Sequence, residues 1–365
     1  MLRPVANPPN PYLSEHREWL EPPPAAKVEV YEETARSILS ENDSPDIPFR
    51  WSINPYRGCQ HACAYCYARP THEYLGMGAG TDFDTKLIAK VNAPELLRHA
   101  FSKRGWEREK VCFSGVTDCY QPIEASYQIT RRCLEVCLAF SNAASIITKG
   151  CLVLRDVDLL VELNRLAGAR VYQSIPFADD KTARLIEPQV PPPSKRFEVM
   201  RRLTDAGVSV GVMVSPVIPG LNDTQIPLIL RCAAEAGAKS AAYTALHLPR
   251  NSAPVFMERI QAAMPDRAGR IESRIREMRS GALNNAAFGA RMRGEGPYWS
   301  NIEALFRVSA KKYGISVPQR PAPKPEQSGS KAKSPRPSKS TLPLPLFEDP
   351  PTRPNRNQME FDFDE

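Results

Sequence analysis

The sequence of 365 residues contains no run of apolar residues long enough to span a bilayer, which excludes helical membrane spans. Its first residues, MLRPVANPPNPYLSEHREWL, also lack the apolar core of a secretory signal. We therefore expect a cytoplasmic protein that does not act at a membrane. In that compartment its nine cysteines would stay reduced and free to bind metal.

The formal net charge of +7 is not carried by the last part of the chain. From Pro321 onward, seven basic residues balance seven acidic ones, so the excess positive charge lies in the body of the protein. A basic body can attract a polyanion such as nucleic acid, or it can be an ordinary solvated surface of mixed charge.

Strand-like and helix-like segments alternate through the middle of the chain. The expected strands are residues 52–54, 110–114, 144–148, 171–175, 209–214 and 240–245, and the expected helices are 93–103, 129–140, 156–166, 193–206 and 225–236. Such alternation predicts parallel βαβ units with right-handed crossovers. Six units fit this length, so the sequence predicts an α/β fold, a partial (βα)6 barrel, because eight units would need more chain.

Composition divides the rest of the chain into further segments. Residues 1–48 predict an extended N-terminal arm with a short amphipathic helix near Glu32–Leu39 that covers an open sheet edge. Residues 49–250 form the expected core barrel and residues 251–316 a C-terminal helical extension or lid. Residues 317–365, rich in proline, lysine and serine, predict a disordered tail.

Three cysteines, Cys59, Cys63 and Cys66, follow the first expected strand in a C-x3-C-x2-C spacing. Three thiolates can hold three irons of a four-iron cluster and leave the fourth iron open to the polar atoms of a small molecule. A closed zinc site would need a fourth ligand, for which His61 and His72 are the local candidates. Incidental cysteines are the third interpretation.

With Tyr65 directly before the third cysteine, the motif resembles the radical S-adenosylmethionine (SAM) superfamily, and the resemblance makes Tyr65 an expected cofactor contact. The resemblance implies that the three cysteines bind a [4Fe-4S] cluster and that SAM chelates the open iron through its amino and carboxylate groups. It also implies that the reduced cluster cleaves SAM to a 5′-deoxyadenosyl radical. An electron donor such as flavodoxin or ferredoxin is then required.

The loop after the second expected strand, SGVTD, holds expected SAM contacts. Gly115 lets the backbone approach a ligand closely, while Thr117 and Asp118 supply acceptors for an amine. In the family this loop binds the SAM amino group, which the resemblance carries to Gly115 and Asp118. Alternatively, Thr117 or Asp118 caps the following helix.

Later loops contribute further candidates. Lys149 ends the third strand and could meet the SAM carboxylate, a substrate phosphate or solvent. Ser174 ends the fourth strand, where relatives in the family contact ribose or carboxylate. In SPVIPGLND, after the fifth strand, the resemblance places Ile218 and Gly220 near the nucleoside. We expect Asp223 to cap the next helix.

A set of motifs between about Phe49 and Phe306 also resembles those of a narrower group. The motifs are NPYRGC, ARPTHEYLG, TDCYQPIE, TKG, LRD, IEP and PVIPGLND. This is a bacterial branch labelled DNA-repair-photolyase-like and related to spore photoproduct lyase. That lyase uses a cysteine near the second-strand loop as hydrogen donor, where this chain has glycine and valine, so dimer repair does not transfer directly. Cys119 is the remaining candidate donor, because it adjoins Asp118 in the expected rim loop.

We therefore expect a radical SAM enzyme that abstracts hydrogen from an unidentified substrate, with nucleic acid favoured by the branch and the basic body. Two alternatives stay open: a radical SAM enzyme acting on a peptide or metabolite, and a non-catalytic iron–sulfur or zinc protein that binds nucleic acid. In the tail, LPLPLF at 342–347 and QMEFDF at 358–363 resemble peptides that dock bacterial DNA-maintenance proteins on the replication sliding clamp.

Overall fold

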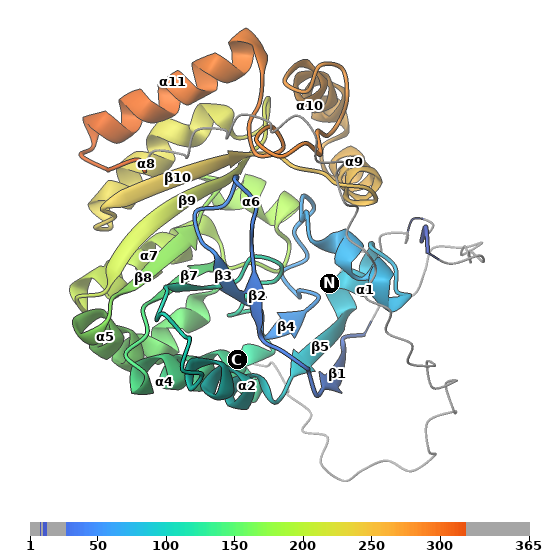
Figure 1. The fold of residues 1–365 in the computed structure, drawn as a ribbon. Helices are drawn as coiled ribbons and strands as arrows, with labels where there is room; N and C mark the ends of the chain where they lie inside the picture. Colours follow the sequence, from blue (N-terminus) through green and yellow to red (C-terminus); the bar gives the residue numbers. More distant parts are fainter. Residues whose placement is uncertain (1–7, 9, 13–26, 319–365) are drawn as a thin grey trace, which may run out of the picture. The chain divides into compact units, whose positions relative to one another are not determined.

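A computed structural model describes residues 8, 10–12 and 27–318 of the chain. Its main sheet has six parallel strands, and each pairs with the strand that precedes it in this series (Figure 1). The strands are β3 (Trp51–Ile53), β6 (Val111–Phe113), β7 (Ala144–Thr148), β8 (Ala169–Ser174), β9 (Ser209–Val217) and β10 (Ser240–Ala245). This order confirms the predicted partial (βα)6 barrel.

Helices cover the outer face of this sheet (Figure 1). They are α2 (Ala93–Phe101), α4 (Ile129–Ala139), α5 (Val157–Leu166), α7 (Pro193–Asp205) and α8 (Ile226–Glu235). Alternate strand residues point toward them; Val171 and Val210 belong to one buried core with Leu163 and Leu203. This packing of strand valines against helix leucines sets which face of the sheet is closed.

The opposite, inner face of the barrel is partly exposed to solvent. Between the buried valines, Arg170 of β8 is exposed, and Tyr172 of β8 and Met213 of β9 are only half-buried. Because successive side chains of a strand alternate between faces, these residues line the inner face. The carboxyl ends of the six strands meet along one rim of that face, where the candidate site lies.

Both edges of the parallel sheet are covered. Strand β2 (Leu39–Glu41) pairs antiparallel with β3, and Ser316 forms a parallel bridge with Ser240 of β10. The added segments satisfy edge N–H and C=O groups that would otherwise be open to another chain.

The prediction of a short helix near Glu32–Leu39 is wrong. The segment instead forms β1 (Glu29–Glu33) and then β2, and β1 joins a second sheet with β5 (Lys86–Lys90) and β4 (Tyr56–Arg57). The Asn92 side chain bonds both the N–H and the C=O of Ala35 and holds the connection extended. A helix this short is only marginally stable in isolation. The segment therefore forms backbone hydrogen bonds with the open edges of β5 and β3 instead.

The C-terminal extension is helical. It comprises α9 (Ser252–Ala263), α10 (Pro265–Glu277) and α11 (Gly296–Lys312), and α11 packs on the β10 side through Trp299 and Phe306, which contact Tyr243. Short connecting elements are α1 (Thr81–Thr85), α3 (Glu124–Tyr127), α6 (Asp180–Ile186), η1 (Arg69–Thr71), η2 (Glu73–Leu75), η3 (Cys151–Asp156) and η4 (Asp223–Gln225).

No helix within the described ranges is long and apolar enough to cross a bilayer. The predicted disordered tail, with both segments that resemble clamp-docking peptides, lies almost wholly outside the described residues.

Candidate active site

The loop of residues 58–67, here the cluster loop, brings the three motif cysteines to the carboxyl end of β3. Cys59 and Cys63 are buried, Cys66 is half-buried, and all three are free thiols. Burial raises the pKa of Cys59 well above its ordinary value, and Asp118, Cys63 and Cys66 raise it further. The thiols are thus near enough to oppose one another's ionisation, which a bound cationic metal centre would relieve.

The donor set fits a multi-iron cluster better than a single zinc ion. Across residues 27–318, no three His, Cys, Asp or Glu side chains are grouped so that they could hold one metal ion. The two candidate histidines have other partners: His72 Nε2 lies 2.8 Å from the Lys86 carbonyl oxygen, and His61 Nδ1 lies 3.3 Å from the Asp118 carboxylate. Three spaced thiols suit three corners of a [4Fe-4S] cluster.

Two arginines, Arg69 (buried) and Arg259 (half-buried), hold the cluster loop from one side. Arg69 donates to the Cys63 carbonyl at 2.9 Å and pairs with Asp84 at 2.9 Å. Arg259 of α9 also pairs with Asp84 and donates to the Ala62 carbonyl at 2.5 Å. Two guanidinium groups share one carboxylate, so the network leaves positive charge beside the loop. Sequence reasoning missed it, because nothing local links residues this far apart.

The loop after β6 holds the cluster loop from the other side. Gln121 Nε2 donates to the Gly58 carbonyl at 3.0 Å, and the Gln60 N–H donates to Gln121 Oε1 at 3.0 Å. The Gln60 side chain accepts in turn from the N–H of Ile123 at 3.1 Å. This reciprocal pair of glutamines fixes the two loops to each other without charge.

Asp118 has its partners within the protein. Its carboxylate accepts from the Thr148 hydroxyl at 2.6 Å and from the Lys149 N–H at 2.7 Å, besides pairing with His61. Burial alone would raise the pKa of Asp118, but His61 and these hydrogen bonds outweigh it and lower the pKa to about 2. Asp118 thus braces three loops, and its expected contact with the SAM amino group stays a prediction.

Thr117 is likewise engaged, whereas Gly115 is open. The Thr117 hydroxyl donates to the Tyr56 carbonyl at 3.1 Å, and its oxygen can still accept from an amine, so the Thr117 contact with SAM stays a prediction. Ser114 (φ 91°) and Gly115 (φ 132°) both adopt positive φ, a strained arrangement for serine that turns the backbone sharply at the end of β6. A side chain at Gly115 would meet nothing within 4 Å, so a ligand can approach its backbone.

Lys149, Ser174 and Tyr65 meet at the barrel rim. Lys149 Nζ donates to Ser174 Oγ at 2.9 Å and lies 5.6 Å from the centroid of the Tyr65 ring. The Lys149 charge opposes the burial that raises the pKa of Cys63 to about 12. The structure thus brings three of the predicted SAM contacts together beside a cluster cysteine.

A buried ion pair that sequence reasoning missed supports Tyr65. The Tyr65 hydroxyl donates to Glu187, which also pairs with Arg196, and all three side chains are buried. Arg196 donates further to the Ser174 carbonyl at 2.7 Å and so ties β8 to the same group. The only signal was the IEP motif, which contains Glu187.

The two predicted nucleoside contacts, Ile218 and Gly220, lie in different surroundings. Ile218 is fully buried in the core that also includes Cys63 and Tyr65. Gly220 faces α10, where a side chain would lie 3.4 Å from Arg274, and its expected place beside the nucleoside stays a prediction. Asp223 accepts from the Gly220 N–H and from Tyr298, and Asn222 occupies the helix-start position expected for Asp223.

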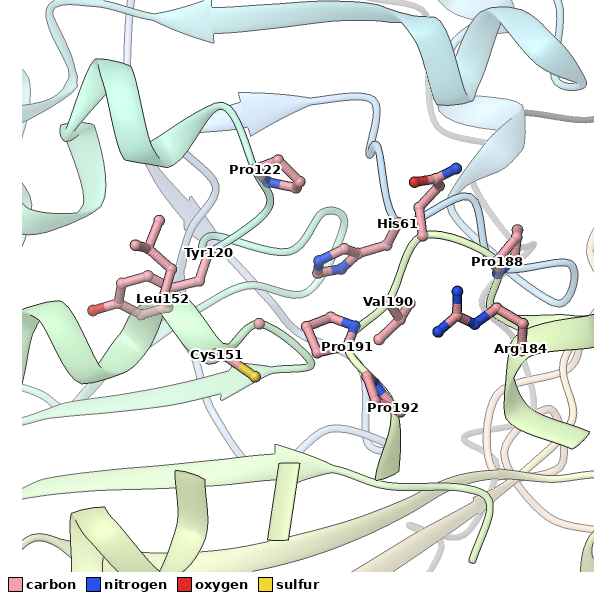
Figure 2. Close-up of a pocket in the computed structure, with 12 residues that line it drawn as sticks. His61, Tyr120, Pro122, Cys151, Leu152, Arg184, Pro188, Val190, Pro191 and Pro192 are labelled. Carbon is pink, nitrogen blue, oxygen red and sulfur yellow. The ribbon is translucent and has the colours of Figure 1, made fainter. Parts of the chain in front are cut away.

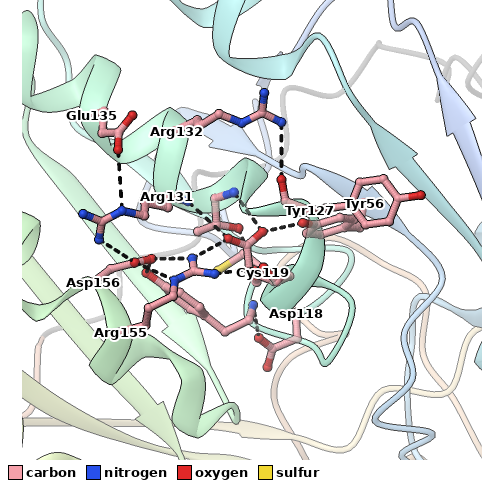
Figure 3. A network of polar contacts seen from close by, with 12 residues as sticks. Tyr56, Asp118, Cys119, Tyr127, Arg131, Arg132, Glu135, Arg155 and Asp156 are labelled. Atoms are coloured by element: carbon pink, nitrogen blue, oxygen red, sulfur yellow. Dashed lines mark hydrogen bonds and ion pairs between the residues drawn. The ribbon is translucent and has the colours of Figure 1, made fainter. Parts of the chain in front are cut away.

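Cys119 does not face the barrel mouth. It is fully buried in the core on the helix side of the sheet, and its carbonyl accepts from the Thr130 hydroxyl at 2.6 Å. Figure 3 shows it inside a charged network in which Arg155 bridges Glu124 and Asp156. The predicted hydrogen-donor position of Cys119 is therefore wrong, because its side chain points away from the inner face.

A pocket of about 400 Å³ lies between His61 of the cluster loop and the segments that follow β6, β7 and β8. Figure 2 shows the His61 ring on one side of it and Val190 and Pro191 on the other, with Cys151 nearby. None of the predicted SAM contacts lines this pocket.

Comparison with known proteins agrees with this geometry. The profile of the Radical SAM superfamily matches residues 53–233. An uncharacterized protein of Mycobacterium tuberculosis is 35% identical over 254 residues, which cover 69% of this chain and 74% of that protein. Another, from Methanocaldococcus jannaschii, is 30% identical over 200 residues, which cover 55% and 72%.

Solved structures share the fold. Spore photoproduct lyase complexed with dinucleoside spore photoproduct matches with a TM-score of 0.59 and 16% identity, covering 79% of this chain and 81% of that chain. A variant of that lyase with bound AdoMet (SAM) and the same dinucleoside matches with a TM-score of 0.58 at 16% identity, with the same coverage. At this identity the likeness concerns the fold alone.

The chain belongs to the radical SAM superfamily. Its cofactors are accordingly a [4Fe-4S] cluster and SAM, and its activity requires an electron donor.

Proposed function

We propose that the protein abstracts hydrogen from a nucleic-acid substrate held at the partly exposed inner face of the barrel. Cys59, Cys63 and Cys66 would hold three corners of the cluster, and SAM would lie between the fourth corner and the strand ends. When bound and supplied with one electron, these groups furnish methionine and a 5′-deoxyadenosyl radical. The remaining steps belong to residues of the chain.

The meeting of Lys149, Ser174 and Tyr65 beside Cys63 carries the proposal. Lys149 presents its ammonium group at the rim, 2.9 Å from Ser174, where it can neutralise a carboxylate. The Tyr65 ring, fixed by Glu187, shields the Cys63 side from water. The backbone at Gly115 can be approached by a ligand and offers its N–H group to a carboxylate, while its carbonyl accepts from the Tyr67 hydroxyl.

Nucleic acid is the substrate class that the remaining features favour. The chain carries a net charge of +7, and the inner face is partly exposed to solvent rather than packed as in a closed barrel. A fold neighbour, spore photoproduct lyase, has been solved with a dinucleoside lesion. A cytoplasmic location, a flavodoxin or ferredoxin donor and clamp docking by the tail accompany the proposal as predictions.

The test is anaerobic. The full chain is reconstituted with iron and sulfide, reduced with dithionite and given SAM, and 5′-deoxyadenosine is measured for wild type and Cys63→Ala. Cys232→Ala, on α8, is the matched control. We expect product from wild type and the control only. A cluster that assembles in wild type without any SAM cleavage would support the binding-protein alternative.

The substrate class is tested in the same assay. DNA or RNA oligonucleotides carrying deuterium on their sugars and bases are compared with a peptide mixture and a metabolite mixture. We expect deuterium in 5′-deoxyadenosine only with nucleic acid. Transfer from peptides or metabolites would replace nucleic acid while leaving the radical chemistry intact.

A further inference from the structure

Exposed aromatic side chains gather around the cluster loop. Tyr12, Tyr67, Tyr74 and Phe288 are between 44% and 64% exposed, although large aromatic rings are normally buried. They come from the N-terminal arm, from the chain after the cluster cysteines, and from the loop between α10 and α11. Segments far apart in sequence therefore present ring faces in one region.

One group of these rings surrounds an arginine. The rings of Tyr12 and Tyr74 lie 5.1 Å apart, and the Arg250 guanidinium carbon lies 5.6 Å and 6.0 Å from their centroids. Arg250 is exposed and donates to the Tyr12 hydroxyl, and it makes no ion pair with any carboxylate among the described residues. Its charge thus stays available to an anion from outside.

A second group of aromatic rings lies toward Gly115, in the loop after β6. The Tyr67 ring lies 6.4 Å from the His247 ring, and the Tyr67 hydroxyl donates to the Gly115 carbonyl. Arg291 stacks on Phe288 at 4.6 Å, and its charge acts on both Tyr67 and His247. Since His247 and Arg250 belong to one short loop after β10, the two groups form one surface.

We call this surface, made of Tyr12, Tyr67, Tyr74, His247, Arg250 and Phe288, the aromatic rim, and we propose that it binds a single-stranded stretch of nucleic acid. Bases stack on the exposed rings, and Arg250 contacts a phosphate. The inference rests on the proposed function and deepens it, because a base stacked near Tyr67 adjoins the Gly115 loop and the expected SAM site.

The chemistry of the rim favours nucleic acid over a protein partner. Exposed aliphatic side chains such as Val161, Leu228 and Val308 lie on the outer helices α5, α8 and α11, not at the rim. A surface of ring faces with the one guanidinium group of Arg250 offers stacking and charge but few aliphatic contacts. Stacking on these rings also needs unpaired bases, which a duplex does not present.

The test measures binding by the purified full chain without SAM, using fluorescence anisotropy of a labelled 15-residue oligothymidylate. Tyr74→Ala and Phe288→Ala remove a ring each, and Arg250→Glu reverses the charge. Tyr31→Ala is the matched control, since Tyr31 is 38% exposed on β1, outside the rim. Circular dichroism and melting curves verify that each variant folds.

We expect each rim variant to raise Kd by about tenfold, the size of one stacking or phosphate contact, and Tyr31→Ala to leave it unchanged. An abasic oligomer of the same length and the duplex should compete weakly. Rim variants that bind as wild type, or an abasic oligomer that competes equally, would overturn the rim assignment. Wild type that binds no oligonucleotide would overturn it too, while the 5′-deoxyadenosine assay separately judges the radical chemistry.

Discussion

Arg259, on helix α9 of the C-terminal extension, donates a hydrogen bond of 2.5 Å to the carbonyl oxygen of Ala62, the residue directly before Cys63. Burial lowers the pKa of Arg259, but the Asp84 carboxylate beside it favours its charged form. An extension beyond the barrel thus brings positive charge to the cluster loop. Charge and hydrogen bonds around a cluster set its reduction potential.

We therefore predict that Arg259→Gln lowers the midpoint potential of the reconstituted cluster, because removing a cation disfavours the added electron. Asp84→Asn should raise it, since it removes the opposing anion, and Arg259→Lys should stay near wild type. The measurement is a redox titration followed by electron paramagnetic resonance, with iron content determined in parallel. Shifts of one sign in both neutralising variants would contradict the electrostatic role.

Lys149 is predicted to bind the SAM carboxylate at the rim. Lys149→Met should raise the Kd for SAM about tenfold or more, the size of a charge-assisted hydrogen bond, while cluster assembly stays intact. Equilibrium dialysis with the reconstituted protein measures it. Lys181→Met, on the exposed side of α6, is the control, and an unchanged Kd in Lys149→Met would refute the contact.

The buried pair of Glu187 and Arg196 predicts an asymmetric stability effect. Glu187→Ala leaves the Arg196 charge buried without its partner and should lower the free energy of unfolding by about 3 kcal/mol or more. The double variant Glu187→Leu with Arg196→Met should cost less than Glu187→Ala alone. Urea unfolding of the metal-free chain measures both, and a larger loss in the double variant would show that the charge is not the cause.

The lowered pKa of His247 predicts that the protein loses stability as the pH falls. Burial lowers the pKa of His247 to about 4, with the nearby arginines adding to the effect and Asn284 opposing it. An unfolded histidine protonates near pH 6.5. Between pH 6.5 and 4 the unfolded chain therefore binds more protons, so stability falls as the pH drops through this window. His247→Gln should flatten that slope in melting curves recorded from pH 7 to 4.5; an identical slope would exclude His247 as its source.

Gly150 joins two loops of the site by close approach. A side chain there would lie 2.4 Å from the Tyr120 carbonyl oxygen, whereas at Gly105 it would meet nothing within 4 Å. Gly150→Ala should lower the free energy of unfolding by about 1–3 kcal/mol, the range for overpacking, and Gly105→Ala should have little effect. Thermal denaturation compares the two, and equal melting temperatures would contradict the close contact.

The barrel and the cluster motif could be predicted from the sequence because their signals are local. Strand and helix periodicities lie within single segments, and the three cysteines with Tyr65 span only eight residues. The same locality explains the failures near Glu32 and Cys119. A short segment does not reveal which sheet edge it will meet, nor which side of a loop will face the core.

By itself, then, the sequence determined the class of fold and the edge of the sheet where the three motif cysteines lie. The tertiary structure alone decided that Asp118 and Thr117 brace loops, and that Arg259 and Arg196 reach the site. Those roles depend on contacts between residues far apart in the chain. A buried charge is costly unless it is paired with an opposite charge or a hydrogen-bond partner. Such pairings are set by how the barrel closes around the cluster loop, which no local pattern encodes.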